Sequence, residues 1–365
     1  MPIEVESPEE MGYSTIECNL AESSVRDISF RDLKIDLNEL VICYGEHRGD
    51  IKLRQSIIDD SPGLNTNEVL VCPGAATALF IVSTTLLQDK DHLIVIRPNY
   101  ATNIETPRAI QCEMTTIDLE FEKGFDLDVE QIKNAVKPNT KLISITTPHN
   151  PGGVEFSAGT MNAIIAFAKS KNIFVLVDET YRYLNFQTEL KPYYAELGSH
   201  VISVSSLSKA FGVPGIRIGW LLSKNEKLQH DFLAAKEQII ITNSVIDEAI
   251  ALHILEQKKQ FLEPAHQLIR ENFTVFKNWM QNNEFFEWVE PKAGVVAFPR
   301  IKSSFPIDIQ QFYSILYSTY KTVVGPGHWF ERDDSYMRIG FGFPKKEELE
   351  RGLNNIELAL KASLI

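Results

Sequence analysis

The chain has 365 residues, of which 44% are hydrophobic and 23% charged, a balance typical of a protein that buries a sizeable core. Its formal net charge of -13 disfavours a surface built to bind nucleic-acid phosphates, because such a surface is basic. The length is more than one hydrophobic core usually holds, which favours two domains.

Residues 1 to about 40 are polar and irregular, and the opening stretch MPIEVESPEE lacks the apolar segment of a signal peptide. The longest apolar run, Ala78–Leu87, is too short to cross a bilayer. The cysteines form no CxxC pair and have no histidine partners of zinc-site type, so we expect reduced thiols and no metal. They are Cys18, Cys43, Cys72 and Cys112. These features predict a cytoplasmic protein without a membrane partner.

From residue 45 onward, short β-branched runs alternate with amphipathic segments such as Met161–Lys169. The run Ile173–Val177 is apolar on both faces, which is typical of a parallel sheet covered by helices. We therefore expect a three-layer α/β/α domain with a mostly parallel sheet over residues 45–255. Its expected strands are Val69–Cys72, Leu93–Arg97, Lys141–Thr146, Ile173–Asp178, Val201–Ser205 and Arg217–Leu222.

The remaining residues predict a smaller α+β domain over residues 256–365, which the N-terminal segment 1–44 joins. Its long helical stretch runs from about Glu256 to Phe286, and a final helix begins at Lys345. Short strands are expected near Val295–Phe298, Thr322–Val324 and Met337–Phe341.

Ligands of open parallel sheets bind at the carboxyl ends of the strands, so the residues after each strand are candidates for a site. Gly74, Ala75 and Ala76 follow the first strand and open a helix, where small residues let a phosphate approach free backbone N–H groups. Taken alone, these residues are better explained by a plain tight connection. Tyr100 follows the next strand and could stack on a flat heteroaromatic ring, or be an ordinary rim tyrosine.

Asn150 lies between two prolines after the third strand, where its amide is free to donate a hydrogen bond. Asp178 ends an apolar strand, and a carboxylate half-buried there needs a partner such as a protonated pyridine nitrogen, unless it caps a helix. Tyr181 follows three residues later and can hydrogen-bond on the same side.

Lys209 gives the sharpest signal, because it is the single lysine in a loop of serines and glycines after the fifth strand. Ser206, Ser208 and Arg217 surround it in sequence and are side chains that bind phosphate. Cationic neighbours would lower the pKa of this lysine and make it a competent amine nucleophile.

Together these residues resemble the class I/II aminotransferases of the fold-type I pyridoxal-phosphate superfamily. The resemblance runs from about Tyr44 to Arg338, and its most specific part is S-x-S-K-x-x-x-x-x-G-x-R-x-G, from Ser206 to Gly219. N-P-G-G at 150–153 and D-x-x-Y at 178–181 support it.

The resemblance implies a fold-type I enzyme with pyridoxal 5'-phosphate as its cofactor, and it implies a role for each candidate. Lys209 would form the Schiff base and later carry the proton, and Asp178 would pair with the pyridinium. Asn150 and Tyr181 would donate to the ring phenolate, and Tyr100 would stack on the ring. The implied phosphate ligands are Ala75, Ala76, Ser206, Ser208 and Arg217.

The resemblance also implies how substrate and partner subunit bind. Arg338 would clamp the substrate α-carboxylate, with Asn150 beside it. Tyr44 would reach the phosphate of a neighbouring subunit, which implies a homodimer with shared active sites. The expected reaction moves an amino group between an L-amino acid and a 2-keto acid.

Decarboxylation, elimination or oxidation of an amino acid remains the alternative, since the same cofactor site supports each. A non-catalytic ligand-sensing domain is a second alternative, although no fused DNA-binding segment is evident. The segment Asn19–Ser24 departs from the family pattern, which leaves the substrate open, and its Glu22 keeps a basic or unusual amino acid possible.

Overall fold

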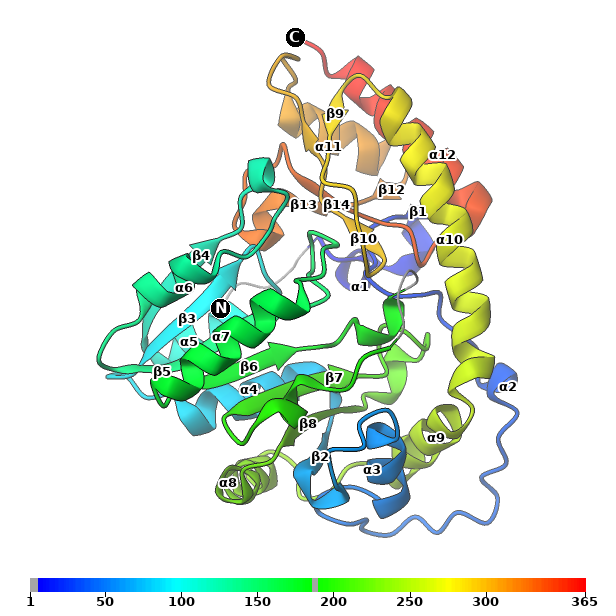
Figure 1. Ribbon diagram of the computed structural model, residues 1–365. Helices are drawn as coiled ribbons and strands as arrows, with labels where there is room; N and C mark the ends of the chain where they lie inside the picture. Colours follow the sequence, from blue (N-terminus) through cyan, green and yellow to red (C-terminus); the bar gives the residue numbers. More distant parts are fainter. Residues whose placement is uncertain (1–5, 186–189) are drawn as a thin grey trace.

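A computed structural model describes residues 6–185 and 190–365 (Figure 1). The helices are α1 Pro8–Met11, α2 Phe30–Leu33, α3 Ile51–Ile58, α4 Gly74–Leu86, α5 Thr102–Ile110, α6 Val129–Ala135, α7 Ala158–Ser170, α8 Glu226–Glu237, α9 Val245–Glu256, α10 Lys258–Asn282, α11 Ile309–Ser318 and α12 Lys346–Ala362. The strands are β1 Cys18–Asn19, β2 Val69–Cys72, β3 His92–Arg97, β4 Glu113–Asp118, β5 Thr140–Thr146, β6 Phe174–Asp178, β7 Val201–Ser206, β8 Gly219–Ser223, β9 Phe286–Glu287, β10 Val296–Ala297, β11 Arg300–Ile301, β12 Thr322–Val323, β13 Gly325–Pro326 and β14 Met337–Gly340.

A seven-stranded sheet in the order β2-β8-β7-β6-β5-β3-β4 forms the centre of the fold. Only β8 runs against its neighbours, so the predicted mostly parallel sheet is confirmed. The edge strand β4 was not predicted, because its exposed and half-exposed residues Glu113–Thr116 do not form an apolar run.

The predicted strand Arg217–Leu222 was wrong at its start. Strand β8 begins at Gly219, whereas Arg217 ends a 3₁₀ turn with a left-handed backbone, φ 46°. This turn lifts the guanidinium out of the sheet, so Arg217 lies at the edge where neighbouring strands end.

Both faces of the sheet are buried. Successive side chains of a strand point to opposite faces, and on each face they pack into a separate hydrophobic core. On strand β3, Leu93 and Val95 join a core with α4, α5 and α8. Ile94 and Ile96, the alternate residues of the same strand, join a core with α6 and α7. The result is the predicted three-layer α/β/α arrangement.

The C-terminal residues form small sheets packed against α10, α11 and α12 (Figure 1). The N-terminal segment enters this region, since β1 pairs in parallel with β12. It then crosses to the large sheet, where the Val25 N–H donates to the Lys209 carbonyl at 2.8 Å. Residues 19–28 therefore bridge the two regions next to the Lys209 loop.

None of the helices within 6–185 and 190–365 is long and apolar enough to cross a membrane.

Candidate active site

A cavity of about 530 Å³ lies at the carboxyl ends of β5, β6 and β7, between the sheet and the C-terminal region. It brings together every site residue predicted from the sequence except Tyr44. Those in its lining are Ala75, Ala76, Tyr100, Asn150, Asp178, Tyr181, Ser206, Ser208, Lys209, Arg217 and Arg338. The Tyr44 side chain is 82% exposed and lies outside the lining of this cavity.

Lys209 points its ammonium into this cavity from the loop after β7. Burial lowers the pKa of the ammonium below its ordinary value, and the nearby Arg338 acts in the same direction, whereas Glu22 opposes both. Within the described residues the ammonium makes no hydrogen bond or ion pair. A buried lysine with a lowered pKa is a stronger nucleophile, because more of it is neutral amine.

Asp178 ends β6 with its side chain buried in the same cavity. Burial raises the pKa of its carboxyl group, and hydrogen bonds from Thr180 and Asn103 oppose the rise. The Thr180 hydroxyl donates at 2.6 Å and the Asn103 amide at 3.2 Å. These donors fix the carboxylate but do not neutralise it, so a cationic partner in the cavity would stabilise it.

Asn150 and Arg338 lie together on another wall. Arg338 Nη1 donates to Asn150 Oδ1 at 3.2 Å, and its Nη2 donates to the Ala21 carbonyl at 2.6 Å. Its Nε is buried without a hydrogen-bond partner in the described chain. The turn that carries Asn150 is held by the buried, neutral His149, whose pKa burial lowers to about 4 and whose ring donates to the Pro98 carbonyl at 2.8 Å.

Tyr181 is buried and donates to the Ser23 hydroxyl at 3.0 Å, which ties it to the N-terminal segment. Burial raises the pKa of its phenol to about 12, so the group is a hydrogen-bond donor at neutral pH.

The N-terminus of α4 provides the expected anion site. The cap residue Pro73 makes no side-chain hydrogen bond to the helix, so the first N–H groups are available to a ligand. Gly74 has φ +82°, and a Cβ there would lie 2.5 Å from Arg217 Nη2. Its missing side chain therefore makes room for the guanidinium beside the helix end.

Ser206 and Ser208 complete this end of the cavity. The Ser208 hydroxyl accepts from Arg217 Nη1 at 3.3 Å. Ser206 is 1% exposed, lines the cavity and has no side-chain hydrogen bond within the described residues. Backbone N–H groups, a free hydroxyl and an arginine together form a site that fits a phosphate.

Several residues of the site were not found from the sequence. Asn103 and Ser23 contact Asp178 and Tyr181 from a helix and from the N-terminal segment, and no local pattern distinguishes them. Trp329 and Phe330 also line the cavity, and the Arg338 guanidinium lies 5.1 Å from the Phe330 ring centroid.

A half-buried lysine, a buried carboxylate and groups that fit a phosphate around one cavity are what pyridoxal phosphate requires, because this cofactor uses a lysine and an acidic partner for its ring nitrogen. The family model for class I and II aminotransferases matches residues 34–356, so the chain belongs to that family.

Relatives match over most of the chain. Capreomycidine synthase of Streptomyces vinaceus is 25% identical and covers 93% of this chain and 89% of its own. A probable N-acetyl-LL-diaminopimelate aminotransferase of Bacillus subtilis is 26% identical, and the match covers 88% of this chain and 82% of the relative. A pyridoxal-phosphate-dependent aminotransferase of Streptococcus suis shares the fold, with a TM-score of 0.89, 24% identity and coverage of 100% and 99%.

The chain is therefore a pyridoxal-phosphate-dependent aminotransferase, an enzyme whose substrates are amino acids and keto acids. These findings do not favour the alternative reactions, decarboxylation, elimination and oxidation. The names of the relatives describe different reactions, so the similarity identifies the family and not the substrate.

Proposed function

We propose that this enzyme binds its cofactor through a covalent bond to Lys209 Nζ and moves an amino group from an L-amino acid to a 2-keto acid. The observation that carries the proposal is that the half-buried Lys209 and the buried Asp178 line one cavity. The anion site at α4, formed with Arg217, lies in the same cavity and suits the cofactor phosphate.

Some of the residues bind the cofactor and the substrate, and Lys209 transfers the proton. The Asp178 carboxylate keeps a proton on the ring nitrogen, and Asn150 and Tyr181 donate to the ring oxygen. Arg338, whose side chain lines the cavity, binds the substrate α-carboxylate with its guanidinium and so orients the Cα–H bond. When bound, pyridoxal phosphate supplies the sink for the electrons that this C–H bond leaves behind. The amine of Lys209 takes the proton from Cα and returns it at the acceptor atom.

Borohydride reduction tests the covalent bond. Reduction of the native enzyme should fix the cofactor to the peptide that contains Lys209, as read by mass spectrometry, and Lys209→Ala should remove the label. Lys236 is an internal control, because it is also buried with a lowered pKa but lies outside the cavity lining. A label on Lys236 would overturn the assignment.

We infer that the enzyme is a homodimer with shared active sites. The segment before α3 exposes large apolar side chains, since Val41, Ile42 and Tyr44 are 72%, 78% and 82% exposed. Such a run is costly in water and suits a surface covered by a second copy. Sedimentation should give a dimer, and mixing inactive Lys209→Ala with Tyr44→Phe subunits should restore part of the activity. A fully active monomer would contradict the inference.

We also propose a division into an N-terminal segment 1–44, a cofactor domain 45–255 and a smaller domain 256–365. The pairing of β1 with β12 supports assigning the N-terminal segment to the smaller domain. A cytoplasmic location is supported by the cysteines, which are all free. Limited proteolysis and cell fractionation test these two points.

A further inference from the structure

The cavity has an acidic wall beside the groups assigned to cofactor and carboxylate. Glu9, Glu22 and Asp27, all from the N-terminal segment, line it together with Tyr13. None of these three carboxylates forms an ion pair within residues 6–185 and 190–365. Glu22 accepts hydrogen bonds from Tyr13 at 3.2 Å and from Asn19 at 3.5 Å, and both donors are neutral.

The backbone of Glu22 is fixed by the fold. A Cβ on Gly340 would lie 2.0 Å from the Glu22 carbonyl oxygen, so the segment lies directly against β14. The preceding Ala21 carbonyl accepts from Arg338 Nη2 at 2.6 Å, and the following Ser23 hydroxyl accepts from Tyr181. Glu22 is therefore held between the residues proposed to bind the carboxylate and the cofactor ring.

The three acidic groups act on one another. Burial raises the pKa of Asp27, and the charges of Glu22 and Glu9 raise it further, whereas Lys209 and Arg26 oppose the rise. Burial also raises the pKa of the Tyr13 phenol. The negative charges nearby raise this pKa further, and the contributing residues, from the largest effect to the smallest, are Glu22, Glu9 and Asp27. Glu22 is half-buried, whereas Glu9 and Asp27 are exposed, so solvent screens the wall in part. Like charges gathered on one wall are still stabilised by a cation placed among them.

The cations of the cavity have other partners when the enzyme is loaded. In the proposed function Arg217 faces the phosphate, which carries about -1.5 to -2 charge near neutral pH, and Arg338 faces the substrate α-carboxylate. Lys209 is bonded to the cofactor or transferring a proton. The carboxylates of the acidic wall then have no cationic side chain of the described cavity lining left to pair with.

We propose that this wall selects the donor amino acid, which carries a positively charged side chain such as a guanidinium or an amine. The proposal rests on the proposed function, because Arg338 must hold the α-carboxylate for the side chain to reach Glu22, Glu9 and Asp27. The same wall disfavours a keto acid with a second carboxylate, so the acceptor is a mono-acid.

The first experiment compares charged and neutral donors of matched shape on the holoenzyme. The rate of the half-reaction is measured spectroscopically for L-arginine, for L-citrulline, its uncharged isostere, and for L-glutamate. One charge-assisted contact corresponds to about tenfold or more, so kcat/KM should favour arginine over citrulline by at least that factor. Glutamate should react more slowly than citrulline. In the reverse half-reaction, pyruvate should give a higher kcat/KM than 2-oxoglutarate as the amino acceptor.

The second experiment measures binding without chemistry. The probes are 5-guanidinopentanoate and 5-ureidopentanoate, which lack the α-amino group and differ in charge. Calorimetry on the holoenzyme should show about tenfold tighter binding of the charged probe. Glu22→Gln should reduce this ratio to about twofold or less and leave the neutral probe unchanged. Glu10→Gln is the matched control, because Glu10 is an exposed neighbour outside the cavity lining; it should keep the full ratio.

The outcomes separate the two proposals. If citrulline or glutamate reacts as well as arginine, charge selection is wrong while amino transfer stands. Equal binding of the two probes, or a full ratio in Glu22→Gln, also overturns charge selection. If no amino acid converts the cofactor, the proposed transfer fails, and the binding ratio still decides whether the wall attracts a cation.

Discussion

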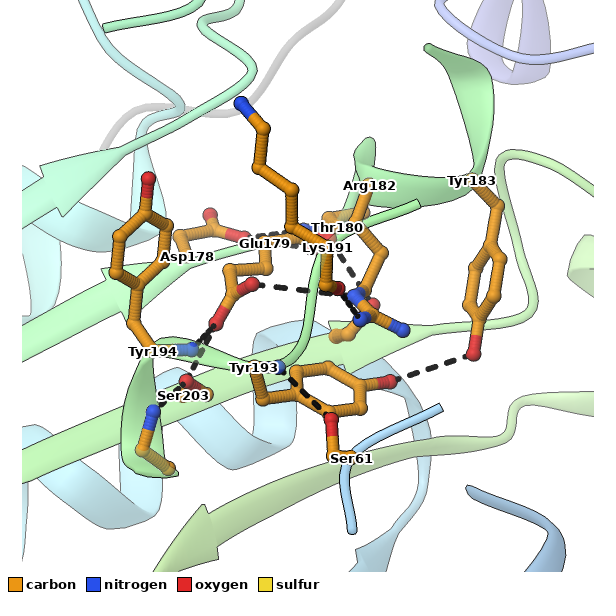
Figure 2. Close-up of polar contacts among 12 residues, drawn as sticks. Ser61, Asp178, Glu179, Thr180, Arg182, Tyr183, Lys191, Tyr193, Tyr194 and Ser203 are labelled. Atoms are coloured by element: carbon orange, nitrogen blue, oxygen red, sulfur yellow. Dashed lines mark hydrogen bonds and ion pairs between the residues drawn. The ribbon is translucent and has the colours of Figure 1, made fainter. Parts of the chain in front are cut away.

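Asp178 and Glu179 are sequence neighbours at the end of β6, and both are buried, yet their carboxylates lie in different surroundings. Asp178 faces the cavity and is held only by neutral donors. Glu179 points away into a polar cluster behind the sheet end (Figure 2), where it accepts from the Ser203 hydroxyl and from the Tyr194 N–H. Its other oxygen lies 3.8 Å from Arg182 Nε.

The cluster behind the sheet is closed by its own residues. The Arg182 guanidinium lies 3.5 Å from the Tyr193 ring centroid, and its Nη2 donates to the Lys191 carbonyl at 2.5 Å (Figure 2). Tyr193 accepts from the Trp220 indole N–H at 3.0 Å. The Asp178 carboxylate lacks a cationic partner in the described chain and is suited to a ligand. The Glu179 carboxylate instead faces the Arg182 guanidinium, whose Nε and Nη1 make no hydrogen bond in the described residues, and the cluster holds the turn in place.

Asp178→Asn should give the largest effect, on the cavity side. The amide keeps the size of the side chain but cannot hold a proton on the ring nitrogen, so the half-reaction rate should fall at least about a hundredfold. Thermal unfolding should be unchanged or shifted upward, because a buried charge is removed. Stopped-flow absorbance and calorimetry measure the two quantities. A near-normal rate would show that another group holds the proton on the ring nitrogen.

Arg217→Gln should affect cofactor affinity on the same side. Loss of its charged hydrogen bonds should weaken pyridoxal-phosphate binding about 10- to 100-fold, as measured by titration of the cofactor-free protein. Tyr193→Phe is the control from the cluster and should leave this affinity unchanged. An unchanged affinity in Arg217→Gln would exclude the guanidinium as a phosphate ligand.

Glu179→Gln should change the pH dependence of stability and leave the half-reaction rate within about threefold. Burial raises the pKa of Glu179 from 4.5 to about 7, so between these pH values the folded state keeps a proton that the unfolded state has released. This contribution to stability is full below about pH 4.5 and is lost as the pH rises to about 7.

The variant lacks this titration, so its stability relative to wild type should increase over that interval by on the order of 1–3 kcal/mol. Urea unfolding of both proteins at several pH values gives the difference. A difference that stays constant from pH 4.5 to 8 would show that Glu179 titrates normally.

Tyr193→Phe should have the smallest effect. Removal of the hydroxyl leaves the Trp220 N–H buried without its acceptor, which should lower the free energy of unfolding by about 1–2 kcal/mol. The half-reaction rate should not change, and a drop in rate with unaltered stability would show that the cluster takes part in the chemistry.

The sequence by itself determined the layers and most of the cavity. Apolar strands such as Ile173–Asp178 predict a covered parallel sheet, and chemistry-bearing residues at their ends, Lys209 among them, must meet at one edge. Local patterns of this kind survive folding, because strand period and turn chemistry depend on near neighbours. The half-exposed β4 escaped prediction since it lacks such a pattern.

Only the tertiary structure decided which polar residues act together across long distances in the chain. Ser23 reaches Tyr181 and Asn103 reaches Asp178, and no local pattern indicates either contact. The departure of the segment Asn19–Ser24 from the family pattern directed attention to Glu22, but only the fold places Glu22 at the cavity with Lys209. The opposite surroundings of Asp178 and Glu179 were also hidden, because successive side chains on a strand point to opposite faces and burial on each face is set by distant segments.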